Sequence, residues 1–253
     1  MSSSTWTLRA VESEARPARA EPWRAVESQH RASTLPLVDS LAEQELLEDL
    51  IEQVKPPLPA TARGLDYLLA TPFRYPPSPY GSRFRTPVDV GVFYAAHELR
   101  TACAEAGYWR WRFMTDSPAL LEIPTMSQTL FQSSIQGSMI DLRAKPFVKH
   151  RARWTHPNDY SYCHAIAKLA REAQIQIIAY ESVRDPDRGG CVAVLSPDAF
   201  ARRTPTKTES WLLTVTKNRV YWQSEARNTA FEFVPTSSHS LVGRVLSRFA
   251  KKK

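Results

Sequence analysis

The chain has 253 residues, which is enough for one substantial domain with an appendage or for two small domains whose cores need no disulfide bonds. Hydrophobic residues make up 43% of the sequence and charged residues 23%, which excludes a wholly disordered chain. The 33 basic side chains outnumber the 26 acidic ones, and the formal charge of +7 suits a phosphate-bearing partner. The sequence contains neither GxGxxG nor GxxxxGK(S/T), which argues against a Rossmann dehydrogenase and a P-loop NTPase.

The cysteines and the apolar stretches indicate where the protein resides. Cys103, Cys163 and Cys191 lie far apart and form no CxxC pair, which is typical of free thiols in a reducing compartment. The first residues lack the apolar segment of a secretory signal. The longest apolar stretches, such as residues 174–180, are far shorter than the ~20 residues of a membrane span. We therefore expect a cytoplasmic protein without membrane contact.

Residues 1–60 differ in composition from the rest of the chain and are predicted to be an N-terminal helical extension. The pentapeptide RAVES occurs at residues 9–13 and again at residues 24–28. Two copies are too few for a repeat fold, so residues 1–36 are interpreted as a mobile or helical arm carrying a small duplication.

An amphipathic helix is predicted over residues 40–54. Ser40 and Glu43 form a capping box, and apolar residues follow at helical spacing: Leu46, Leu47, Leu50, Ile51 and Val54. Prolines 56 and 57 end the helix. We expect its apolar face to pack on the main domain or on a second copy of the chain, so a homo-oligomer is one expected partner state.

Residues 61–235 are predicted to be the main domain, in which a mixed or antiparallel sheet is surrounded by helices. Residues 65–69 are a short helix or turn, and a proline-rich loop follows over residues 73–87. Helices are expected over residues 98–106 and 159–173, and strands over residues 91–96, 175–180, 191–195, 211–216, 219–223 and 229–234. Because helices and strands do not alternate regularly, the predicted class is α+β. Residues 236–253 are expected to hold a basic amphipathic helix, residues 241–249, that ends in three lysines.

Three segments carry a family resemblance: PFRYPPSPYGSRF, GVFYAAHELRTACAE and YESVRDPDRGGCVAVLSPDAF. Over residues 65–234 the chain resembles the RES domain family, which is named for arginine, glutamate and serine and whose best-described members are toxins of bacterial toxin–antitoxin pairs. The resemblance implies a fold similar to that of ADP-ribosyltransferase toxins. It also implies an enzyme that degrades NAD with phosphate as the acceptor, and a helix-turn-helix antitoxin as partner, through which alone DNA would be contacted.

The resemblance assigns catalytic roles to four residues. The family's arginine, tyrosine, glutamate and serine fall on Arg83 in GSRF, Tyr94 in VFYAA, Glu105 in TACAE and Ser182 in YESVRDP. Many members read GGRW followed by Asn where this chain reads GSRFR. Arg74 and Arg85 are therefore rival or helper candidates for the arginine role, and both are assigned to substrate binding together with Arg184.

These residue types suit cleavage of the nicotinamide–ribose bond. A carboxylate such as Glu105 stabilises the positive charge that develops on the ribose. Arginines bind pyrophosphate and phosphate with planar paired donors, Tyr94 can stack on a ring of the dinucleotide, and Ser182 can bond a carboxamide or ribose hydroxyl. The scheme uses NAD as substrate and inorganic phosphate as co-substrate, and needs no metal or other cofactor. ADP-ribosyl transfer to a protein and simple hydrolysis of NAD remain alternatives.

Other interpretations of the sequence stay open. His150, His156, Cys163 and His164 could be imagined as zinc ligands, but their spacing matches no usual structural site. The run of aromatic and arginine residues at 108–113 is either a half-buried structural segment or, with the basic C-terminal helix, a nucleic-acid-binding surface.

Overall fold

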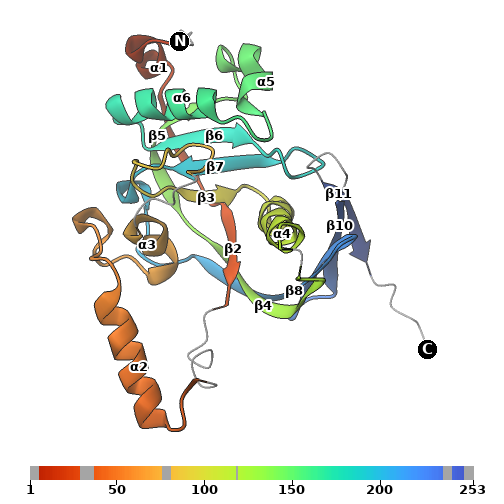
Figure 1. The fold of residues 1–253 in the computed structure, drawn as a ribbon. Helices are drawn as coiled ribbons and strands as arrows, with labels where there is room; N and C mark the ends of the chain where they lie inside the picture. Colours follow the sequence, from red (N-terminus) through yellow and green to blue (C-terminus); the bar gives the residue numbers. More distant parts are fainter. Residues whose placement is uncertain (1–5, 29–36, 76–80, 118, 236–240, 248–253) are drawn as a thin grey trace.

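A computed structural model of the chain describes residues 6–28, 37–75, 81–117, 119–235 and 241–247 (Figure 1). Within these residues one sheet of eleven strands runs in the order β1-β5-β6-β7-β3-β2-β4-β8-β9-β10-β11. The strands are β1 (Arg16–Ala20), β2 (Trp23–Glu27), β3 (Phe93–Ala96), β4 (Glu122–Gln132), β5 (Ile135–Asp141), β6 (Ile177–Glu181), β7 (Gly190–Val194), β8 (Lys207–Thr216), β9 (Arg219–Ser224), β10 (Thr229–Pro235) and β11 (Leu241–Ser247). Neighbours pair antiparallel except β5 and β6, which are parallel. The predicted α+β class with a mixed sheet is confirmed.

Helices cover both faces of this sheet. They are α1 (Leu8–Ser13), α2 (Leu41–Val54), α3 (Tyr67–Arg74), α4 (Leu99–Thr115), α5 (Arg151–Trp154) and α6 (Ser161–Glu172), with short 3-10 turns η3 (Ala60–Ala62), η4 (Phe147–His150) and η5 (Pro197–Ala199). The sheet curves around α4, which is seen end-on at the centre of Figure 1, and α4 contacts β2, β3 and β8 to β10. Helix α2 projects away from the body of the molecule.

Small side chains let α4 approach the sheet closely. Ala104 and Cys103 are fully buried, and a Cβ added at Gly107 would lie 2.6 Å from the Val220 side chain. Tyr108, the next residue, is buried in the same core. The helix is longer than the predicted 98–106, because it continues through the aromatic run at 108–113. Glu105 therefore lies on a helix that packs closely against the sheet.

The N-terminal segment belongs to the sheet, so its prediction as an arm is wrong. Strand β1 pairs with β5, and β2 lies between β3 and β4. The structure therefore does not separate residues 1–60 from the main domain. Among the described residues of this segment, only α2 extends outward: Leu46 and Leu50 are 59% and 50% exposed, while Leu47 and Ile51 are half-buried. The predicted cap of this helix is present, because the Ser40 hydroxyl accepts from the backbone N–H of Glu43 at 3.2 Å.

Two further predictions need correction. Residues 241–247 form strand β11 rather than a helix, because the open edge of β10 pairs with them over residues 229–235. The remaining residues of the predicted C-terminal segment, 236–240 and 248–253, lie outside the described residues. The predicted loop at 73–87 begins inside α3, and its residues 76–80 also lie outside them. The sequence analysis assigned no element to β4 and β5, although β4 is one of the strands that flank β2.

Candidate active site

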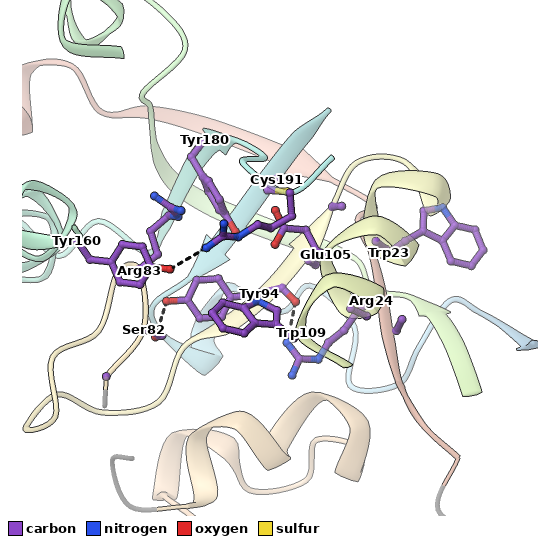
Figure 2. Close-up of a pocket in the computed structure, with 17 residues that line it drawn as sticks. Trp23, Arg24, Ser82, Arg83, Tyr94, Glu105, Trp109, Tyr160, Tyr180 and Cys191 are labelled. Atoms are coloured by element: carbon purple, nitrogen blue, oxygen red, sulfur yellow. Dashed lines mark hydrogen bonds between the residues drawn. The ribbon is translucent and has the colours of Figure 1, made fainter. Parts of the chain in front are cut away.

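A cavity of about 510 Å³ opens between β2, β3, the 81–83 loop and α4 (Figure 2). This volume falls in the range of about 300–1,000 Å³ that is usual for small-molecule sites. Four predicted site residues line it: Arg83, Tyr94, Glu105 and Arg184. The three sequence segments of the resemblance thus meet at one cavity.

Glu105 is held in place by Ser182. The Ser182 hydroxyl donates to Oε1 of Glu105 at 2.5 Å and accepts from the backbone N–H groups of Arg184 and Asp185 at 3.2 and 2.9 Å. Ser182 is fully buried and lies behind the carboxylate rather than on the cavity wall. Its proton therefore orients Glu105, whereas the sequence analysis expected it to bond the substrate directly.

Asp185 anchors the loop that carries Ser182. It is 3% exposed, and its carboxylate accepts from Arg100 at 2.6 Å and from the Thr101 hydroxyl at 2.7 Å. Both donors lie in the first turn of α4, the helix that also carries Glu105. The loop and the helix are therefore fixed relative to each other close to the Ser182–Glu105 bond.

Arg83 lies at one end of the cavity. Its Nη1 donates to the carbonyls of Trp154 and His156 at 2.9 and 3.0 Å, and its guanidinium lies 4.6 Å from the centre of the Tyr160 ring. Burial alone would lower the pKa of Arg83, but the surrounding Cys163, Tyr160, Tyr180 and Glu105 groups raise it above the ordinary arginine value. The side chain is therefore a permanent, immobilised cation.

Tyr94 fixes the loop that carries Arg83. The Tyr94 phenol accepts from the backbone N–H of Phe84 at 2.9 Å and shares a 2.8 Å hydrogen bond with the Ser82 hydroxyl. Burial raises the pKa of Tyr94 to about 12. The phenol is therefore neutral at physiological pH and serves as a hydrogen-bonding and packing group.

Of the three arginines proposed for substrate binding, only Arg184 reaches the cavity. Its Nη2 donates to the Pro157 carbonyl at 2.6 Å, and its guanidinium lies 4.0 Å from the centre of the Tyr108 ring. Arg74 points toward α2 instead, where it forms a 2.8 Å ion pair with Glu52. Arg85 donates to the Asp89 carbonyl at 3.3 Å and does not line the cavity. Among the loop arginines, the geometry therefore favours Arg83 as the family's arginine.

Several residues that line the cavity are not among the predicted site residues. Trp23, Arg24 and Ala25 come from β2, and aromatic or sulfur side chains come from elsewhere: Trp109, Tyr160, Tyr180 and Cys191. Burial raises the pKa of the Cys191 thiol well above its usual value, so it is a poor nucleophile. Tyr180 and Cys191 lie in the third segment of the resemblance, whereas no motif marks the β2 residues, which only strand pairing brings to the site.

The other interpretations gain no support from the geometry. Among the described residues, no cluster of three or more histidine, cysteine or acidic side chains is placed to hold a metal ion. The ring of His164 bonds the Ser82 carbonyl at 2.7 Å, while the neighbouring Cys163 is buried against the Trp154 carbonyl. Arg110 in the aromatic run pairs with Glu27, so it is not a free cation for a nucleic acid. In the part of the chain that the structure describes, no helix is long and apolar enough to span a bilayer.

The family model described as RES domain matches residues 58–216. No curated protein sequence matches the chain. A similar solved structure is the crystal structure of the MbcT–MbcA toxin–antitoxin complex from M. tuberculosis, with 12% sequence identity and a TM-score of 0.48, covering 83% of this chain and 92% of that chain.

Proposed function

Because this chain belongs to the RES domain family, we propose that it is a toxin that cleaves the nicotinamide–ribose bond of NAD, with inorganic phosphate as the acceptor. The observation that supports this function best is the carboxylate of Glu105, which faces a cavity of ligand size and is held at 2.5 Å by the buried Ser182 hydroxyl. The products would be nicotinamide and ADP-ribose 1″-phosphate.

Glu105 acts in this proposal by stabilising charge. As the bond to nicotinamide breaks, the electron pair leaves with the neutral base and positive charge develops on the ribose. A carboxylate already fixed by Ser182 requires no reorganisation to stabilise that cation. Phosphate then forms the new bond to the ribose carbon, so no covalent enzyme intermediate is required.

The cationic and aromatic walls would bind the rest of the reactants. Arg83 and Arg184 supply positive charge near Glu105, which suits the pyrophosphate of NAD and the incoming phosphate. Trp109, 52% exposed on α4, offers a ring face on which a base can stack.

The reaction is tested by incubating the purified full chain with NAD, with and without phosphate, and separating the products by mass. We expect nicotinamide release that depends on phosphate, together with ADP-ribose 1″-phosphate. Free ADP-ribose would instead indicate hydrolysis, and a modified protein would indicate ADP-ribosyl transfer. Absence of nicotinamide release under all these conditions would contradict the proposed function.

Two substitutions test the roles of the site residues. Glu105→Gln keeps the size and hydrogen bonding of the side chain but removes its charge, so turnover should fall about 100-fold with little change in KM. Ser182→Ala keeps the charge of Glu105 but no longer orients its carboxylate, so turnover should fall less, about tenfold. Both variants should retain the circular dichroism spectrum of the parent. Normal turnover in Glu105→Gln would rule out the cation-stabilising role.

The proposal includes partners. We expect a helix-turn-helix antitoxin that covers the cavity and through which alone the complex contacts DNA. The exposed Leu46 and Leu50 on α2 support a second interaction, self-association of the chain. Co-expression with the product of the adjacent gene should restore growth of producing cells, and light scattering of the purified chain reports its oligomeric state.

A further inference from the structure

Arg24 occupies a position that neither the family match nor the sequence motifs assign to the site. It lies on β2, whereas the family model begins at residue 58. Arg24 lines the 510 Å³ cavity and also a smaller neighbouring cavity of about 60 Å³ between β2 and α3. In Figure 2 Arg24 and Arg83 lie on opposite sides of the cavity, with Glu105 and Tyr94 between them.

The charge of Arg24 is poorly compensated by the protein. Its Nη1 donates to the Tyr94 carbonyl at 2.7 Å, and its guanidinium lies 4.8 Å from the centre of the Phe93 ring. Its buried Nε has no hydrogen-bond partner within the described residues, and no carboxylate there forms an ion pair with it. Glu27, on the same strand, pairs with Arg110 instead. Burial lowers the pKa of Arg24 to about 10, which still leaves it positively charged at neutral pH.

A half-buried cation without a neighbouring acid costs free energy unless an anion compensates it. A guanidinium that lines a ligand-sized cavity without a paired carboxylate is suited to a phosphate oxygen. We propose that Arg24 binds the pyrophosphate of the dinucleotide substrate, so that a strand outside the family-matched region completes the active site. This inference rests on the proposed function, because it takes NAD as the substrate.

The position of Arg24 distinguishes it from the other cavity arginines. Nη1 of Arg83 donates to two backbone carbonyls, and Arg184 donates to a carbonyl and to the Tyr160 hydroxyl. Both lie on the side of the cavity where the 154–160 segment supplies acceptors. Arg24 stands at the opposite side, beside the smaller cavity, where an extended dinucleotide would continue beyond the ribose that Glu105 faces.

The chain supplies a matched control for this proposal. Arg9 opens the first copy of the pentapeptide that Arg24 opens in the second, and it is exposed on α1. Arg9→Gln and Arg24→Gln therefore remove the same charge from the same local sequence. Arg24→Lys keeps the charge but loses the planar pair of donors.

Steady-state kinetics with NAD and calorimetric titration with ADP test the proposal on the full chain. We expect Arg24→Gln to raise KM for NAD and the Kd of ADP about tenfold, with kcat nearly unchanged. Inhibition by nicotinamide and KM for inorganic phosphate should not change, and Arg24→Lys should be intermediate. Arg9→Gln should match the parent in every measurement.

The possible failures are distinguishable. Unchanged ADP affinity in Arg24→Gln would overturn the inference. So would a loss of nicotinamide binding as large as the loss of ADP binding, or an increase only in KM for phosphate. If Arg24→Gln does not fold, unchanged ADP affinity in Arg24→Lys would overturn it in the same way. A parent protein that binds ADP through Arg24 but releases no nicotinamide would contradict the proposed reaction and leave the assignment of Arg24 intact.

Discussion

The two copies of RAVES fold differently, although their sequences are identical. Residues 9–13 lie in helix α1, whose first turn is capped by the Thr7 hydroxyl. Residues 24–27 of the second copy lie in strand β2, which pairs with β4 over its whole length. Val11 is fully buried in the helical copy, whereas in the strand copy it is Arg24 that reaches the cavity.

This difference shows that the pentapeptide has no strong conformational preference of its own. Alanine, arginine and glutamate favour helices, whereas valine favours strands, so the local preferences nearly cancel. The neighbouring elements therefore determine the conformation of each copy: residues 23–27 pair with β3 and β4, and α1 packs against α6. Matched substitutions in the two copies therefore isolate the effect of tertiary context.

Proline at the alanine of each copy should give the largest contrast. Ala25 lies in the middle of β2, opposite Leu130, and a proline there should reduce the free energy of unfolding by about 3 kcal/mol or more. Ala10 lies in the first turn of α1, where proline is tolerated, so Ala10→Pro should cost only the cap bond, about 1 kcal/mol. Urea denaturation of both variants measures this, and equal losses would show that β2 is not required for the sheet.

Substitution of the valines should give a smaller contrast, in which the helical copy loses more stability than the strand copy. Val11 is fully buried in the main core, so Val11→Ala should lower the free energy of unfolding by about 2 kcal/mol. Val26 is only half-buried, and Val26→Ala should cost about half as much. The same denaturation assay compares them. A larger loss at Val26 would mean that α1 is not packed as described.

The glutamates should differ least. Glu27 pairs with Arg110 at an exposed site, so Glu27→Gln should cost no more than about 0.5 kcal/mol, and the loss should shrink at high salt. Glu12 is exposed on α1, and Glu12→Gln should be neutral. Stability measured at low and high ionic strength distinguishes the two. A salt-independent loss at Glu27 would contradict a surface ion pair.

Much of the central fold could be predicted from local pattern. The strands predicted at 211–216, 219–223 and 229–234 are confirmed by β8 to β10, and the strands predicted at 175–180 and 191–195 correspond to β6 and β7. The apolar residues of Leu241–Ser247 recur at helical spacing, but the segment is strand β11, because it pairs with the edge of β10. Residues 122–141 gave no clear signal, although they form two long strands.

For the site, the resemblance predicts roles for Arg83, Tyr94, Glu105 and Ser182, and the structure brings these four residues together at or directly behind one cavity. The sequence could not decide among the neighbouring arginines, because Arg74 at the end of α3 and Arg83 and Arg85 in the following loop take directions that depend on what packs around them. The ion pair of Arg74 with Glu52 turns it away from the cavity, whereas the carbonyls of Trp154 and His156 hold Arg83 toward it.

The sequence by itself thus determined the α+β class and the chemistry-bearing segments, because hydrophobic period, turn residues and motifs are local properties. Only the tertiary structure decided that Ser182 orients Glu105 and that Arg24 lies on the cavity. The hydrogen bond between Ser182 and Glu105 joins positions 77 residues apart, and the one between Arg24 and Tyr94 joins positions 70 residues apart. Strand pairing and helix packing bring such distant positions together, and their free energy comes from contacts that no short stretch of sequence contains.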